Sequence, residues 1–125
     1  MKSPLIALTV AGLLASAGAA NAHHSGAMFD RSQTKMVTGT IKDFEWTNPH
    51  SSFSVVTNVG GTDEVWLFEM NSPQNLVREG WKRSTLTPGD KVTVTYNPLR
   101  DGKPGGWYVS IALPSGQTLG GEPPK

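Results

Sequence analysis

The sequence predicts a mostly β fold, a small five-stranded OB-like β-barrel with one short helix between strands 3 and 4. Two observations support this prediction: five segments have β-strand patterning, and one helix signal falls between the third and the fourth of them. The expected strands cover residues 36–46, 51–59, 64–70, 91–96 and 107–113, and the expected helix covers residues 73–79. This order of elements is that of an OB-type Greek-key barrel, although small barrels of other topology remain open.

The first expected strand changes its apolar phase part-way along. Val37, Gly39 and Ile41 alternate with other residues, after which the apolar positions move to Phe44 and Trp46. A change of phase inside one strand predicts a bulge or a sharp bend.

The third expected strand and the helix that follows it have clear local signals. Residues 64–70 are apolar on both faces, with Val65 on one and Trp66 on the other, so we expect both faces to be covered. Ser72 is a good N-cap, the proline after it suits the first helical position, and Gly80 suits the position after the last turn. These residues predict a helix of two turns.

A long hairpin loop, residues 97–106, is expected between the last two strands. The alternation before it places Tyr96 inside, and the alternation after it places Trp107 and Ile111 together on one face. In OB barrels the loops after strands 1 and 4 often frame the binding face. The corresponding segments here are residues 47–50 and the long hairpin loop.

The chain is expected to divide into four segments. Residues 1–22 have a basic start, an apolar run of about 10 residues and a small-residue cleavage site, which describe a signal peptide. An extended N-terminal arm (23–35), the β-barrel domain (36–113) and a flexible tail (114–125) follow. Because a spanning helix needs roughly 20 apolar residues, an uncleaved membrane anchor is the less favoured alternative. We therefore expect a periplasmic protein without stable membrane anchoring after signal cleavage.

Charge and composition argue against several classes of protein. The chain has 11 Lys and Arg and 10 Asp and Glu, and removal of residues 1–22 takes away only Lys2, which leaves no net charge. A nucleic-acid-binding protein would show a basic excess or stripe, so we expect no nucleic-acid partner. There is no cysteine and therefore no thiolate metal site. Without a cysteine nucleophile or a Gly-x-Ser-x-Gly motif, a side-chain-only enzyme is not favoured.

The three histidines suggest a copper site. Cleavage after Ala22 would make His23 the first residue, whose α-amine and ring Nδ1 can chelate one metal ion. His50, in the first expected barrel loop, would complete a three-nitrogen site, called a histidine brace. Nitrogen ligands in tetragonal geometry favour Cu(II), and His24 offers another route through the amine, a backbone amide and its own ring. Copper is thus the expected cofactor, in a carrier, buffer or accessory protein.

Other interpretations of these residues stay open. Met28 is a candidate secondary ligand, because a thioether suits Cu(I). An exposed pair of histidines at a chain terminus can also bind copper without any function. The alternative function is a metal-free interaction or small-ligand-binding module, in which Trp46, Asn48 and His50 contact a periplasmic protein partner or a small molecule.

Several motifs resemble those of a family of small exported bacterial proteins classed as a domain of unknown function. They are "HHS" at 23–25, "EWTNPH" at 45–50, "FEMNSPQNLVREGW" at 68–81, "LTPGDKVTV" at 86–94 and "LPSGQTL" at 113–119. Two positions depart from the family pattern, Gly26 and Ser52, where the family usually has a bulkier residue. The resemblance implies that His23, His24 and His50 belong to a shared pattern.

Overall fold

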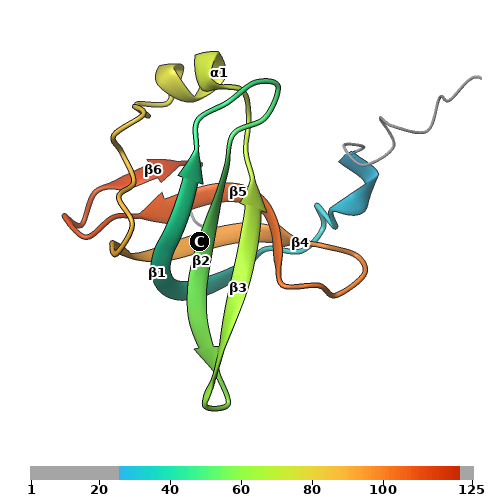
Figure 1. The fold of residues 1–125 in the computed structure, drawn as a ribbon. Helices are drawn as coiled ribbons and strands as arrows, with labels where there is room; N and C mark the ends of the chain where they lie inside the picture. Colours follow the sequence, from blue (N-terminus) through green and yellow to red (C-terminus); the bar gives the residue numbers. More distant parts are fainter. Residues whose placement is uncertain (1–25, 122–125) are drawn as a thin grey trace, which may run out of the picture.

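Five strands close into a barrel in the part of the chain that the structure, a computed structural model, describes, residues 26–121 (Figure 1). The strands are β1 (Lys35–Glu45), β2 (Ser52–Val59), β3 (Thr62–Glu69), β4 (Lys91–Pro98) and β5 (Gly105–Ala112). Helix α1 (Pro73–Arg78) follows β3. Neighbouring strands pair in the order β3-β2-β1-β4-β5, and a parallel pairing of β3 with β5 closes the barrel. This confirms the predicted OB-like fold.

Strand β1 bends so that it can pair with two different partners. Its first half pairs with β4 and its second half with β2, and the register shifts between Ile41 and Asp43. The predicted bulge is therefore confirmed, with Lys42 as the extra residue. A Cβ atom on Gly39 would overlap the Val55 side chain and the Val56 carbonyl, so only glycine lets the strands approach this closely.

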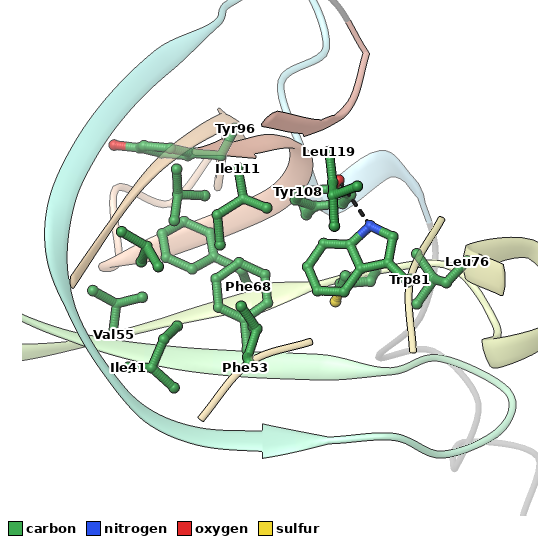
Figure 2. Close-up of a cluster of buried hydrophobic side chains, with 14 residues drawn as sticks. Ile41, Phe53, Val55, Phe68, Leu76, Trp81, Tyr96, Tyr108, Ile111 and Leu119 are labelled. Carbon is green, nitrogen blue, oxygen red and sulfur yellow. Dashed lines mark hydrogen bonds between the residues drawn. The ribbon is translucent and has the colours of Figure 1, made fainter. Parts of the chain in front are cut away.

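The barrel interior is filled with apolar and aromatic side chains from all five strands (Figure 2). Phe53 and Phe68 pack at a ring-centroid distance of 5.2 Å near its centre. Leu76 of α1 and Trp81 beyond it are also fully buried and close one end of the barrel. Ser72 caps α1 by accepting a hydrogen bond from the Asn75 backbone N–H, as its position predicts.

Two expectations about the strands are wrong. Val65 and Leu67, on the outer face of β3, are 50% and 53% exposed, so nothing among the described residues covers that face. In β5, Tyr108 is buried and Trp107 is only half-buried, because a register shift in the pairing with β4 moves the inward phase. The sequence alternation had placed Trp107 and Ile111 on the same face.

The two ends of the described chain are more ordered than expected. A short 3-10 helix, η2 (Gly26–Met28), begins it, and Phe29 is buried in an isolated bridge with Leu99. The expected flexible tail contains strand β6 (Thr118–Gly120), which pairs with β5, so this prediction is wrong for that segment. The buried Leu119 side chain fixes β6 to the core.

The predicted signal peptide, residues 1–22, lies outside the described residues, as do His23 and His24. Within residues 26–121 no helix combines the length and the hydropathy that a membrane span needs.

Candidate functional site

The loop between β1 and β2 is held in place by the residue that follows His50. Ser51 is fully buried, its backbone N–H donates to the Asn71 carbonyl (3.1 Å), and its carbonyl accepts from the Met70 N–H (2.9 Å). Its hydroxyl accepts from the Thr47 N–H and donates to the Thr47 carbonyl, each at 3.3 Å. The Asn48–Pro49 peptide within the loop is cis. The hydrogen bonds of Ser51 fix the position of the neighbouring His50 backbone.

The His50 ring is fixed as well. Its Nδ1 donates a hydrogen bond to the Met70 carbonyl at 3.0 Å, since a carbonyl oxygen can only accept. The neutral ring therefore carries its lone pair on Nε2, which is the atom that a metal ion would bind. Metal-ligating histidines commonly donate their other ring N–H to such an oxygen, which orients the ring.

Trp107, at the start of β5, brings His50 and the N-terminal arm together. The His50 and Trp107 rings pack edge to face at 5.8 Å, and Phe29 packs on the same indole at 5.7 Å. The Arg31 guanidinium lies 5.1 Å from the indole centroid, in a cation–π contact. We call these four residues, Phe29, Arg31, His50 and Trp107, the Trp107 cluster.

Backbone and side-chain hydrogen bonds fasten the arm to the β4–β5 hairpin beside this cluster. The Asp30 N–H donates to the Pro98 carbonyl at 2.8 Å. Arg100 donates twice in the other direction, from its N–H to the Met28 carbonyl (2.9 Å) and from Nε to the Ala27 carbonyl (3.0 Å). In Figure 1 the blue segment accordingly lies beside the end of β4. The arm is thus docked from its first described residues.

A hollow of about 230 Å³ adjoins Trp107. Arg31, Glu79, Trp107 and Tyr108 are among the residues that line it. Burial raises the pKa of the Glu79 carboxyl. Burial also raises the pKa of Tyr108, more than the hydrogen bond from Trp81 lowers it. Both groups are therefore protonated over a wider pH range than when fully solvated.

The candidate site residues from the sequence are only partly brought together. His50 lies in the Trp107 cluster, whereas Trp46 is half-buried and packs on Phe44 at 5.8 Å, against the core. Asn48 is exposed at the loop tip, and Met28 is half-buried in η2. No group of three or more His, Cys, Asp or Glu side chains within residues 26–121 could hold a metal ion. A site with three such ligands would need residues from outside this range.

Sequence reasoning missed Trp107, Phe29 and Arg31 as neighbours of His50. The aromatic residue Phe29, at the end of the short apolar run Ala27-Met28-Phe29, was the one available signal, because an aromatic residue of that size is usually packed against something. The contact with Trp107 itself depends on how the β5 register and the arm meet in space.

A family model for a family of unknown function, DUF6152, matches residues 10–108. The chain belongs to this family. The range of the match includes all three histidines and so confirms the resemblance that the motifs suggested. No curated protein sequence matches this DUF6152 member.

Two of the solved structures that resemble this DUF6152 member are crystal forms of one single-stranded DNA binding protein. One is the mitochondrial single-stranded DNA binding protein Rim1 of S. cerevisiae (Form2), with a TM-score of 0.50 and 12% identity, over 71% of this chain and 96% of Rim1. A second crystal form of Rim1 (Form1) has a TM-score of 0.48 and 13% identity, over 73% and 98% of the two chains. At this identity the likeness of the first form shows the fold alone.

Proposed function

We propose that this small β-barrel protein of the DUF6152 family is exported to the periplasm and binds copper through His23 and His50. His23 would supply its α-amine and its ring, and His50 would supply Nε2. The observation on which this rests is the Trp107 cluster, in which the arm and the loop histidine contact the same indole. The protein would act as a copper carrier, buffer or accessory protein.

The length of the arm is compatible with this site. His23 precedes the first residue of η2 by three residues, and three extended residues span at most about 10 Å. The Phe29 and His50 rings each lie within 6 Å of the Trp107 ring centroid. The arm would bring its first residue to His50 within this span, or within a longer one if η2 is released from Arg100.

The chemistry of the ligands favours copper over harder cations. An amine and two imidazoles are nitrogen donors, which suit Cu(II) in tetragonal geometry, while Mg²⁺ and Ca²⁺ prefer oxygen ligands. The amine must be deprotonated, and its ordinary pKa is about 7.7–8.0, so we expect copper affinity to fall as the pH falls below neutrality. His24 and Met28 are the additional candidate ligands, His24 through the amine-and-amide route.

The test is a Cu(II) titration of protein that begins at His23, followed by calorimetry and by electron paramagnetic resonance. The matched control carries three extra residues, Gly-Ser-Gly, before His23, which leaves every side chain in place and moves the amine out of chelating position for both His23 and His24. We expect the extra residues and His50→Ala each to weaken binding at least tenfold and to change the copper spectrum. Thermal unfolding of the copper-free variants checks that the barrel is intact.

Three outcomes separate the alternatives. Equal affinity and identical spectra for the protein with and without the extra residues would contradict the proposal. Loss of binding in His24→Ala with little effect of His50→Ala would replace the brace by the amine-and-amide site. The second candidate function, an interaction module that uses the exposed loop tip at Asn48, predicts that Asn48→Ala weakens partner binding while chelators have no effect.

A further inference from the structure

A second pocket lies between the N-terminal arm, the β4–β5 hairpin and the barrel. Its volume is about 350 Å³, within the range typical of small-molecule sites. Asp30 and Gln33 of the arm line it, whereas Arg31, between them, lies over Trp107. We call it the Tyr96 pocket, after the one tyrosine in its lining.

The Tyr96 pocket has an aromatic wall that contains one unused hydrogen-bonding group. Trp66 and Tyr96 pack edge to face at 5.9 Å, and Tyr96 is only 4% exposed. The Tyr96 hydroxyl makes no hydrogen bond with another described residue, and Figure 2 shows it pointing away from the core cluster. Every fully buried side-chain nitrogen or oxygen in the described chain has a hydrogen-bond partner. Because the Tyr96 hydroxyl has none, it is not fully buried, and it is open to the pocket that Tyr96 lines. It can donate a hydrogen bond to a ligand there.

Cations outnumber anions around this hydroxyl. Lys35 is directly opposite Tyr96 in the β1–β4 pairing, which places both side chains on the same side of the sheet. Arg100 also lines the pocket, and its bond to the Ala27 carbonyl orients the guanidinium. Lys103 is the third cation, and its ion pair with Asp101, at 3.8 Å between exposed side chains, is weak.

The one carboxylate in the lining is already engaged. Asp30 accepts hydrogen bonds from the Ser32 hydroxyl and N–H and from the Gln33 amide. These bonds, with a smaller contribution from the Arg100 charge, lower the pKa of Asp30. The lining therefore has three cations and one carboxylate, whose oxygens already accept hydrogen bonds from Ser32 and Gln33. Two further carboxylates lie next to lining residues, Asp101 beside Lys103 and Glu64 beside the Trp66 indole N–H.

We propose that the Tyr96 pocket binds a small organic anion, a single ring that carries a carboxylate or a phosphate. The ring lies against Trp66, and the anionic group accepts hydrogen bonds from the Tyr96 hydroxyl, Lys35 and Arg100. This site shares no ligand-binding side chain with the proposed copper site. The two proposals can therefore fail independently.

The test is a two-dimensional ¹H–¹⁵N NMR titration of metal-free protein, purified from cells that express the full 125-residue sequence. The probes are benzoate and phenyl phosphate, with benzyl alcohol as the neutral analogue and inorganic phosphate as the anion without a ring. We expect saturable shifts of the backbone signals of Lys35, Tyr96 and Gly102 with the two aromatic anions. The signals of β2 and α1, which do not line the pocket, should not move.

Variants then test each part of the pocket. We expect Lys35→Gln to weaken phenyl phosphate binding about tenfold, as loss of a charged hydrogen bond does. Lys91→Gln is the matched control, because Lys91 is an exposed lysine of β4 outside the lining. Tyr96→Phe should weaken binding severalfold while thermal unfolding stays unchanged, since its hydroxyl has no hydrogen bond in the described chain.

Three results would overturn the proposal. They are equal binding of benzyl alcohol and benzoate, equal binding of inorganic phosphate and phenyl phosphate, and equal effects of Lys35→Gln and Lys91→Gln. The first removes the need for charge, the second removes the ring, and the third moves the site away from the Tyr96 pocket.

Discussion

Trp81 and Trp107 show what the same side chain does in two parts of one small barrel. Trp81 is 1% exposed and packs against Phe53 and Tyr108, at ring-centroid distances of 6.5 and 5.3 Å. Within residues 26–121 its side chain makes one hydrogen bond, from Nε1 to the Tyr108 hydroxyl, at 3.2 Å. Trp107 is half-buried, and its neighbours are a histidine, an arginine and a phenylalanine of the arm.

The difference separates a tryptophan of the core from one that joins the arm to the His50 loop. The neighbours of Trp81 belong to the barrel, so its contacts stabilise the fold and offer no exposed polar group. Trp107 joins two segments far apart in the sequence, the arm and the His50 loop, and leaves their polar groups near the surface. The two indoles should therefore respond differently to truncation.

The largest expected effect is the loss of Trp81. Trp81→Ala should lower the free energy of unfolding by about 3–5 kcal/mol, because a buried indole is removed and a cavity remains. Trp107→Ala should cost roughly 1–2 kcal/mol, since less apolar area leaves contact. Chemical denaturation followed by circular dichroism measures both. Equal losses would show that the Trp107 cluster is also part of the core.

If the proposed copper site exists, copper affinity should give the opposite order in the same pair. Trp107→Ala should weaken Cu(II) binding by the correctly processed protein, because both the arm and His50 lose their common neighbour. A conservative exchange, Trp81→Phe, keeps the barrel filled and should leave copper affinity unchanged. A larger effect of Trp81→Phe than of Trp107→Ala would contradict the division of roles.

Local signals made most of the fold predictable. The cap at Ser72, the turn glycine Gly80 and the phase change in β1 each depend on residues close in sequence, and the structure shows all three. Gly80 has a φ of 95°, a conformation that glycine adopts without strain. The order of strands and helix then left few ways to close a small barrel.

Contacts between distant segments could not be predicted in the same way. The His50 ring is oriented by a carbonyl 20 residues later, at Met70. The inward phase of β5 changes at Val109, where the pairing with β4 skips one residue, and nothing in the local pattern marks that position. The strand at residues 118–120 was missed because it is short and lies among glycine and proline residues.

A smaller loss of stability is expected when the hydrogen bond of the Trp81 side chain is removed. Tyr108→Phe should cost about 1–3 kcal/mol, because the buried Trp81 N–H then has no acceptor. Tyr96→Phe is the control, since its hydroxyl has no hydrogen bond in the described chain, and it should change stability by less than about 0.5 kcal/mol. If the two substitutions cost the same, the Trp81–Tyr108 bond contributes nothing net.

Alkaline pH should destabilise the barrel through its two buried tyrosines. Burial raises the pKa of both Tyr96 and Tyr108 above the ordinary value of about 10, so the folded protein keeps these protons when the unfolded chain loses them. Their contribution to stability is complete below pH 10 and is lost as the pH rises through the folded-state values. The free energy of unfolding should then fall by up to about 1.4 kcal/mol per pH unit for each tyrosine. Denaturation at a series of pH values between 9 and 11.5 (roughly the range around the ordinary tyrosine pKa) measures this slope. Tyr108→Phe should reduce it by the share of that one residue, and an unchanged slope in the variant would show that Tyr108 ionises as easily in the barrel as in the unfolded chain.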